Sequence, residues 1–558
     1  MQYIIVGSII LTLSILSIIL GNIKHRKRRI NQIRESFGAK PALKKYDFEA
    51  LSTHWNEHTR GVAEDEKIDD ITWSDLDMNQ VFMRVNACSS FLGEQVLYSR
   101  MHCTPTQLHR IESFEEKIRF FDSHDSIREQ TQLLLGKLAF NHNSYTMPKY
   151  IAKLNQYRIR NIWMYQAMQG LLVLSILPAI IFRDIGLMII FLGGFSINLL
   201  IYVRSKSKYE VDMDMLSSIL KVVNTGKLLA KHKKFNFPTG LHGLEKLNQS
   251  FGNISKAVEV LHAKKEAAIY GDIFGLLQDY LVGATLWDFI KYDQIIGMLE
   301  NKKTIFMEMF WEVGEIDAAI SIASYRKSLH KYCMPTFAAH EHITVDQIFH
   351  PLIDAPVHNS VHLDKNCIIT GSNASGKSTF IKSVALNLIL GQSINTCTAS
   401  RMVMPLTRIV TSMAVRDDLM TGESYYIKEI KYLNRIIQSL DKNRFLVCVI
   451  DEILRGTNTE ERIAASASIL EFLDRSHCLA IVASHDIELT KLLKGQYTNY
   501  YFKETMNGRD VTFDYKINNG SAVSKNAIKL LEVVGFPESI VARAQALAQM
   551  SSGVSKAD

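Results

Sequence analysis

The chain is poor in cysteine, and the few cysteines that it has form no recognisable pattern. Seven cysteines are spread over 558 residues, with no CxxC pair among them. An odd number at wide spacing argues against a disulfide framework and against a zinc site. The simplest interpretation is a protein that keeps its thiols reduced in a cytoplasmic compartment.

The sequence also lacks internal repeats, low-complexity tracts and a strong net charge. Its 64 basic and 57 acidic residues give a formal net charge of +7. This mild excess permits nucleic acid or an anionic membrane surface as a partner but establishes neither. A chain of this length, 47% hydrophobic, is sufficient for two or three domains with buried cores.

Long apolar runs, in contrast, are present at two places, and the first is at the N-terminus. Residues 3–20 carry no charge and are followed closely by the basic cluster 24–29. At about 1.5 Å per residue this run approaches the thickness of the hydrocarbon core of a bilayer. A cleaved signal peptide carries its charge before the apolar run, so we predict an uncleaved anchor with its basic end in the cytoplasm. The alternative is a buried core helix.

The second apolar region covers residues 164–203 and contains only two charged residues, Arg183 and Asp184. Basic residues flank it on both sides, which favours a helical hairpin that leaves and re-enters the cytoplasm. The alternative is an apolar hairpin buried against a partner protein. The flanking residues are Arg158, Arg160, Arg204, Lys206 and Lys208.

The segment Gly371-Ser-Asn-Ala-Ser-Gly-Lys-Ser378 has the GxxxxGK[ST] pattern of a phosphate-binding loop. It follows the apolar run 367–370 and precedes a helix-like stretch, and this strand–turn–helix context suits such a loop. Glycines let the backbone bend and point its N–H groups at phosphate oxygens. Lys377 is predicted to reach the terminal phosphates, and the Ser378 hydroxyl to hold Mg²⁺.

Two further apolar runs end in residues suited to hydrolysis. Residues 445–450 lead into Asp451 and Glu452, and residues 480–484 lead into His485. We assign Asp451 to the Mg²⁺ shell and Glu452 to the positioning and polarisation of the attacking water. His485 would contact the γ-phosphate or that water. A solvated acidic turn and a structural histidine are the alternatives.

The spacing of apolar residues along the sequence predicts an all-α region followed by a C-terminal α/β domain. Helical spacing dominates before about residue 337, and short apolar runs alternate with helices after it, as in a mostly parallel sheet. The expected parts are an N-terminal transmembrane anchor (1–22), a polar linker (23–71), a first helical core segment (72–162), an apolar transmembrane hairpin (163–203), a second, lever-like helical core segment (204–338) and a P-loop ATPase domain (339–558).

Taken together, these motifs resemble the MutS family of DNA mismatch-repair ATPases, within the ABC ATPase superfamily. The segment 370–379 is similar to TGPNxxGKST, with Ser372 in place of Pro. Residues 451–457 are similar to DELGRGT, with Leu454 in place of Gly. The further segments with this likeness are 422–430 (GxSTFMxEM), 483–485 (ATH), the C-terminal segments 520–524 and 535–544, which look like the dimerisation helices, and, more weakly, 90–98 and 314–323.

The resemblance implies a homodimer with composite sites for ATP and Mg²⁺. The apolar segments and their basic flanks place the chain at the inner membrane, with its ATPase domain facing the cytoplasm. ATP binding would tighten the dimer and hydrolysis would loosen it. The catalytic residues would be Glu452 and His485, and Ser424 of the other subunit would complete the site. Nucleotide would bind Gly371, Asn373, Gly376, Lys377, Ser378 and Thr379, with Mg²⁺ at Ser378 and Asp451.

Two functions are compatible with these motifs. The first is a MutS-like ATPase that couples its cycle to DNA binding, although the mismatch-reading and connector domains are not recognisable. Basic residues suited to phosphate contacts are Lys227, Lys231, Lys233 and Lys234. The second is a membrane-associated mechanochemical ATPase that acts on a protein or lipid partner. Half of an ABC transporter is disfavoured, because the chain has few apolar spans and no LSGGQ-like signature.

Overall fold

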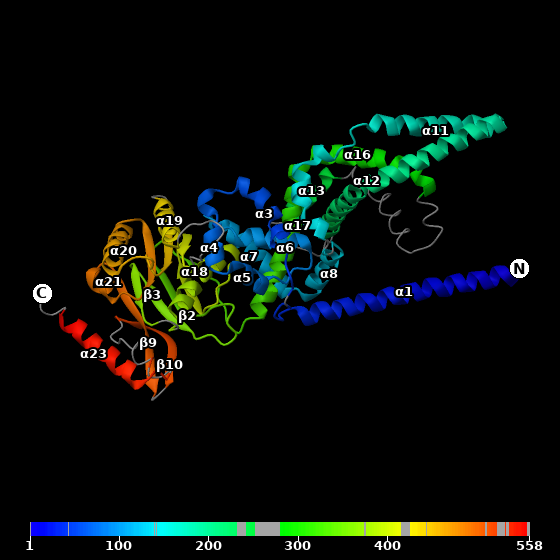
Figure 1. Cartoon of the computed structure of the whole chain (residues 1–558). Helices are drawn as coiled ribbons and strands as arrows, with labels where there is room; N and C mark the ends of the chain where they lie inside the picture. Colours follow the sequence, from blue (N-terminus) through cyan, green and yellow to red (C-terminus); the bar gives the residue numbers. More distant parts are fainter. Residues whose placement is uncertain are drawn as a thin grey trace. The chain divides into compact units, whose positions relative to one another are not determined.

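The chain folds into two compact units, which are described separately here (Figure 1). Unit 1 comprises Met1–Gly61, Val85–Ser99 and Glu112–Ser328, and unit 2 comprises Val62–Arg84, Arg100–Ile111 and Leu329–Asp558. The computed structural model describes residues 2–42, 44–138, 140, 142–182, 184–231, 241–251, 280–372, 375–413, 425–441, 444–507, 510–521, 531 and 535–554.

The regular secondary structure in the described residues of unit 1 is helical. Its elements are α1 (Gln2–Ser36), α2 (Phe48–Leu51), α3 (Thr53–His58), η1 (Thr59–Gly61), most of α6 (Phe91–Met101) and α7 (Leu108–Ser123), α8 (Asp125–Leu135), η3 (Gly136–Leu138), α9 (His142–Tyr145), α10 (Met147–Ala152), η4 (Leu154–Tyr157), α11 (Ile162–Phe182), α12 (Ile185–Lys231), α13 (Leu241–Ser250), α16 (Trp287–Glu300) and α17 (Lys303–Lys327).

The first helix is longer than the apolar run at its start. The sequence predicts an anchor that ends at residue 22, but α1 continues through the basic cluster to Ser36. No glycine or proline interrupts residues 22–36, and Gly38 then adopts φ +86°, the left-handed conformation that commonly ends a helix. The basic cluster is therefore helical and belongs to the same continuous helix as the apolar segment.

Helices α6 and α17 pack closely at the centre of unit 1. The carboxylate of Asp317 on α17 accepts hydrogen bonds from the backbone N–H groups of Ser89 and Ser90, at 3.0 and 2.8 Å, and from the Ser90 hydroxyl at 2.6 Å. A Cβ atom at Gly314 would lie 2.5 Å from Cγ2 of Val96, so this approach requires glycine. Burial raises the pKa of Asp317 to about 7, although these hydrogen bonds act to lower it.

The apolar hairpin consists of α11 and the first part of α12, which lie side by side (Figure 1). Both helices are long and apolar enough to cross a bilayer by length and composition, a test that a soluble core helix also passes. Only 12% of the most apolar window of α11 and 11% of that of α12 are buried, unlike a core helix. At the tip, Phe182 and Ile185 are 72% and 77% exposed.

The second hairpin helix does not stop at the end of the apolar region. It continues from residue 203 to Lys231, and in this part Leu216, Ile219 and Val223 are buried in unit 1. One continuous helix thus joins the exposed apolar tip to the packed core of the unit.

Unit 2 is an α/β unit with two sheets. The larger sheet has the order β10-β9-β4-β8-β7-β6, and the smaller one has the order β1-β5-β2-β3. The strands are β1 (Thr336–Phe337), β2 (Ile343–Ile348), β3 (Asn359–Leu363), β4 (Cys367–Thr370), β5 (Arg401–Met404), β6 (Arg408–Ser412), β7 (Leu446–Asp451), β8 (Cys478–Ser484), β9 (Thr498–Asn507) and β10 (Asp510–Asn519). The helices are η2 (Glu64–Glu66), α4 (Asp70–Asp75), α5 (Met78–Val85), α18 (Lys377–Ile394), α19 (Tyr425–Gln438), α20 (Thr459–Asp474), α21 (Ile487–Leu492) and α23 (Glu538–Val554).

The larger sheet is mostly parallel, as the sequence predicts. All its pairings are parallel except the β9–β10 hairpin. Residues of β4, β7 and β8 are buried almost without exception, which explains why they read as continuous apolar runs. Alternate residues of β7, beginning with Leu446, form an apolar cluster with α19 and α20. Helix α18 also contacts β7 and β8 but is not part of this cluster.

Helix α4 packs on β6, the edge strand of the larger sheet. The buried carboxylate of Asp75 accepts hydrogen bonds from the Thr411 hydroxyl at 2.7 Å and from the Met413 backbone at 3.0 Å. At the other end of α4, Asp69 forms an ion pair with Arg435 of α19. These contacts hold the end of β6 and helix α19, the elements on either side of residues 414–424.

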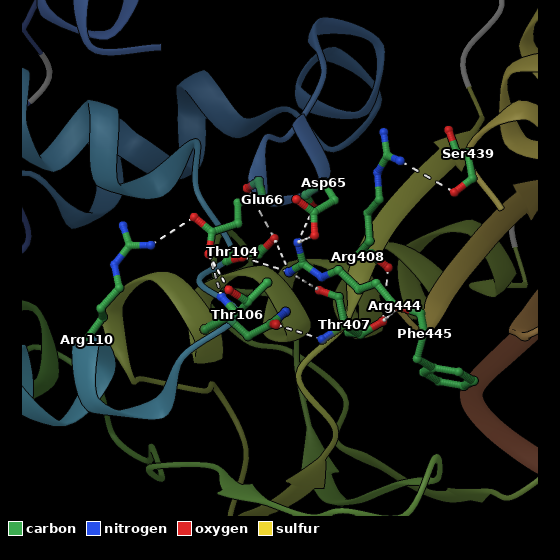
Figure 2. A network of polar contacts seen from close by, with 11 residues as sticks. Asp65, Glu66, Thr104, Thr106, Arg110, Thr407, Arg408, Ser439, Arg444 and Phe445 are labelled. Atoms are coloured by element: carbon green, nitrogen blue, oxygen red, sulfur yellow. Dashed lines mark hydrogen bonds and ion pairs between the residues drawn. The ribbon is translucent and has the colours of Figure 1, made fainter. Parts of the chain in front are cut away.

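A second polar network joins an N-terminal segment to the same edge of unit 2 (Figure 2). Arg444 is almost fully buried and donates to the carbonyl oxygens of Thr104 and Thr407, at 2.7 and 3.2 Å. Glu66 accepts from the backbone of Thr106 at 2.7 Å and from Arg110 at 2.8 Å. These contacts lie within unit 2, to which residues 62–84 and 100–111 belong. The helical region expected over residues 72–162 is therefore divided between the two units.

Candidate functional site

The carboxyl ends of β4, β7 and β8 meet at one edge of the larger sheet. Thr370 pairs with Ser484, and Asp451 pairs with Ala483. The loop after β4, the acidic pair after β7 and the histidine after β8 therefore lie together. In open α/β sheets this edge is the usual place for a ligand.

The loop 371–376 depends on two glycines with positive φ. Gly371 has φ +150° and Gly376 has φ +104°, backbone conformations that residues other than glycine rarely adopt. A Cβ atom at Gly376 would also lie 3.1 Å from the Tyr515 ring. Gly376 immediately precedes α18, so the free N–H groups of the first helical turn are presented beside the loop.

Lys377 folds back onto this loop. Its Nζ donates to the carbonyl oxygens of Gly371 and Ser372, at 2.7 and 2.9 Å, and lies 3.4 Å from Nε2 of His485. Burial lowers the pKa of Lys377 to about 8, although the nearby carboxylates of Glu452 and Asp451 act to raise it. Charged phosphate oxygens are stronger hydrogen-bond acceptors than carbonyl oxygens. The ammonium group of Lys377 is therefore suited to leave these carbonyl oxygens for the oxygens of a phosphate.

Asp451 contains a buried carboxylate oxygen that lacks a partner. Its Oδ1 forms no hydrogen bond with any residue that the structure describes. Burial raises the pKa of Asp451, partly offset by a hydrogen bond with Ser378. An unpaired buried carboxylate oxygen is costly, and carboxylate and hydroxyl oxygens are ligands that Mg²⁺ accepts. The pair Ser378 and Asp451 therefore fits a bound Mg²⁺.

Glu452 is held in a fixed orientation. Its Oε1 lies 3.0 Å from Nε2 of His485, and its Oε2 forms an ion pair with Arg455. Burial acts to raise the pKa of Glu452, but the contacts with His485 and Arg455 outweigh it and the pKa lies below its usual value. Glu452 has φ +63°, a strained conformation of the kind that clusters at functional sites. An ionised, oriented carboxylate therefore faces the pocket lined by Glu452, Ile453, Arg455, Arg462, Ser484, His485 and Asp486.

Leu454, two residues further on, also has a left-handed backbone, with φ +58°. This is the position at which the resembling motif has glycine. A left-handed conformation costs a residue other than glycine about 1–2 kcal/mol. The Leu454 side chain is buried in the apolar cluster of α19, α20 and the sheet, so its burial offsets the strain.

We predict that Leu454→Gly is more stable than Leu454→Ala, by about 1 kcal/mol, because both lose the buried side chain but only glycine relieves the backbone strain. The control is Leu470, a buried residue of the same cluster inside α20. There alanine is expected to be better than glycine by about 1 kcal/mol, since the backbone is helical. Thermal unfolding of the four variants shows which of glycine and alanine is the more stable at each position. If the same residue is the more stable at both positions, the account is contradicted.

Ser372 also differs from the TGPNxxGKST motif, which has proline at this position. Its hydroxyl donates to Oε2 of Glu504 on β9 at 2.6 Å. This hydrogen bond connects the β9–β10 hairpin to the loop 371–376. On the other side of the site, the backbone N–H of Arg455 donates to the buried carboxylate of Glu429 on α19, at 3.0 Å.

An apolar pocket of about 270 Å³ lies beside the loop and was not foreseen from the sequence. No spacing pattern could have indicated it, because the fold alone brings its three segments together. Gly376 and Thr379 lie at its edge. Its other lining residues are Ile348, His350, Ile353, Ala355, Pro356, Val357, Asn359, Phe380, Ser383 and Tyr515.

The structure brings together all the predicted site residues that it describes: Gly371, Gly376, Lys377, Ser378, Thr379, Asp451, Glu452 and His485. Asn373 and Ser424 lie outside the described residues. Of the basic residues considered for DNA contacts, Lys227 and Lys231 lie at the end of α12 in unit 1. Lys233 and Lys234 are outside the described residues.

Parts of this chain are similar to known proteins. A family model described as MutS domain V matches residues 367–551. The DNA mismatch repair protein MutS of Thermotoga maritima is 29% identical over 263 residues, which cover 45% of this chain and 33% of the relative. That of Natronomonas pharaonis is 32% identical over 246 residues, 42% of this chain and 28% of the relative. That of Leuconostoc mesenteroides is 26% identical over 341 residues, 55% of this chain and 39% of the relative. The chain thus matches about a third of the length of these relatives.

Proposed function

We propose that this chain, whose residues 367–551 match MutS domain V, is a Mg²⁺-dependent ATP hydrolase of the MutS family that works as a homodimer. One observation carries this proposal. A lysine-bearing glycine loop, a buried carboxylate oxygen without a partner and an oriented glutamate meet at one edge of the sheet.

Nucleotide binding follows from the loop and α18. The β- and γ-phosphates would accept from backbone N–H groups of the loop and of the first turn of α18. Lys377 would leave the carbonyl oxygens of Gly371 and Ser372 for the terminal phosphates. Mg²⁺, when held by Ser378 and Asp451, would neutralise part of the phosphate charge. The base would occupy the apolar pocket beside Gly376 and Thr379, which is large enough for it.

Hydrolysis requires a water molecule aligned with the γ-phosphorus. Glu452 would accept a hydrogen bond from this water and take its proton as the oxygen attacks and the bond to the ADP oxygen breaks. His485 holds Oε1 of Glu452 and lies 3.4 Å from Nζ of Lys377. It therefore links the base to the group that would bind the phosphates.

Dimerisation would complete the site with Ser424 of the partner subunit, as the family resemblance implies. One feature of the described residues supports an association of subunits. In and just before α23, the apolar side chains of Phe536, Ile540 and Leu547 are about half exposed.

DNA is the first candidate for what the cycle acts on, because the relatives are named DNA mismatch repair proteins. A membrane is the second candidate, favoured by the exposed apolar hairpin and by its continuity with the core of unit 1 through α12. In that case the ATPase domain would work at the cytoplasmic face of the inner membrane, with α1 as an additional anchor.

The test compares ATP turnover by the purified full-length chain with duplex DNA and with phospholipid vesicles. Stimulation by DNA that disappears as salt is raised supports the first candidate, because phosphate contacts release counterions. Stimulation by vesicles alone supports the second. No hydrolysis under either condition would contradict the proposed ATPase itself.

A further inference from the structure

A basic pocket of about 560 Å³ lies in unit 1 between α1 and the region of α8, far from the candidate ATP site in the sequence. Its lining residues are Asn22, His25, Arg26, Arg29, Gln130, Leu133, Leu134 and Lys137. None of these residues is acidic. Within the described part of the chain, none of the three basic side chains Arg26, Arg29 and Lys137 forms an ion pair.

Helical periodicity builds this pocket from both sides. Residues 22, 25, 26 and 29 lie on one face of α1, and residues 130, 133, 134 and 137 recur with the same spacing along α8 and the turn that follows it. The remaining basic residues of the cluster, Lys27 and Arg28 among them, fall on other faces of α1. Only part of the basic cluster is therefore gathered into the pocket.

The two walls are fixed to each other at one end. Arg34 of α1 forms a two-pronged ion pair with Glu129 of α8, with Nη2 and Oε2 2.9 Å apart. The guanidinium of Arg128 lies 3.5 Å from the ring centre of Phe37. These contacts hold α1 against α8 beyond Arg29, so the pocket lies between them and the apolar run of α1.

The position of the pocket along α1 indicates the environment of its ligand. Asn22 to Arg29 follow the apolar run 3–20 by about 3–14 Å along the helix, at about 1.5 Å per residue. If the apolar run spans the hydrocarbon core, the pocket begins in the phospholipid headgroup layer, which is about 5–8 Å thick on each side. The long side chains of Arg26 and Arg29, which follow in the helix, can extend back toward this layer. Leu133 and Leu134 give the pocket an apolar floor beneath its basic rim.

We propose that this pocket binds the phosphate of an anionic phospholipid, with Arg26, Arg29 and Lys137 on the phosphate and the two leucines against the glycerol and the first acyl carbons. The floor favours a lipid over a free phosphate ion, which would gain nothing from apolar contact. This inference rests on the proposed membrane association. A bound lipid would cross-link α1 to the core of unit 1 and so fix the unit at the membrane surface.

Native mass spectrometry of the detergent-solubilised full-length chain, titrated with phosphatidylglycerol or phosphatidylcholine, tests the proposal. Wild type is expected to retain phosphatidylglycerol preferentially. The double variant R26Q/R29Q is expected to lose about thirtyfold in affinity, since each basic residue near a membrane surface contributes roughly a factor of five. The matched control K27Q/R28Q removes the same charge from other faces of α1 and is expected to keep the affinity.

The outcomes separate the proposals. Equal loss in both double variants would indicate diffuse attraction to the basic cluster, and no loss in R26Q/R29Q would indicate a site elsewhere; either result overturns the pocket. Displacement of the lipid by inorganic phosphate alone would make it a site for the free ion and would overturn the lipid assignment. A chain that stays in solution without detergent and binds neither lipid would contradict the membrane association itself, and the pocket proposal with it.

Discussion

Replacement of Lys377 by alanine is expected to abolish ATP binding at any practical concentration. The ammonium group would form two or more charge-assisted hydrogen bonds with the phosphates, each worth about 1.5–3 kcal/mol. Their loss weakens the affinity by roughly 10²- to 10⁴-fold. Equilibrium dialysis with labelled ATP measures this change.

A matched control is Lys491→Ala, an exposed lysine on α21 of the same unit. It removes the same charge from the protein but not from the site, so ATP affinity should be unchanged. Thermal unfolding without nucleotide shows whether the Lys377 variant is folded. Undiminished ATP binding by a folded Lys377→Ala protein would refute the role of the loop.

The pH dependence of wild type follows from the same side chain. Burial lowers the pKa of Lys377 to about 8, and the phosphates require the protonated form. Well below pH 8 the lysine is already charged, so affinity should change little there. Above pH 8 a proton must be taken up with ATP, so affinity should fall by up to about tenfold per pH unit. In Lys491→Ala, which keeps Lys377, the same slope is expected.

Glu452→Gln is expected to bind ATP but to hydrolyse it roughly 10²- to 10⁴-fold more slowly, because an amide cannot take a proton from water. The change keeps the size of the side chain and leaves Lys377, Ser378 and Asp451 in place. If ATP closes the dimer, the variant should accumulate in the dimeric state when ATP is present. Single-turnover hydrolysis and the molecular mass with ATP measure the two effects.

The control for Glu452→Gln is Glu460→Gln, an exposed acidic residue in the first turn of α20. It should turn ATP over at the wild-type rate, because its carboxylate is not part of the pocket lined by Glu452 and His485. Wild-type turnover by Glu452→Gln would show that another group activates the water. Loss of ATP binding in this variant would instead give Glu452 a role in holding the nucleotide.

Local patterns predict much of the candidate ATP-binding region. The glycine loop between a β-branched run and a helix placed β4 and α18 correctly, and the apolar runs before Asp451 and His485 are β7 and β8. These elements are readable because strands buried on both faces are continuously apolar. The roles of the residues that follow these strands stay predictions. The structure shows that these residues lie close together, because the carboxyl ends of β4, β7 and β8 meet.

Long-range contacts were not predictable in the same way. Arg444 and Thr104 are 340 positions apart, and nothing in the sequence near either residue indicates the other. The same holds for Asp75 and Met413, which are 338 positions apart. Such contacts divide the N-terminal helical region between the two units. The left-handed backbone of Leu454 was also hidden, because a leucine gives no local signal of positive φ.

Retention of ATP and self-association by the full-length chain in lipid nanodiscs test the account most directly. Mass photometry with and without ATP and Mg²⁺, combined with filter binding of labelled nucleotide, gives both quantities on one sample. The account predicts bound ATP and a doubling of the protein mass when nucleotide is added. A chain that neither holds ATP nor changes its mass would contradict it.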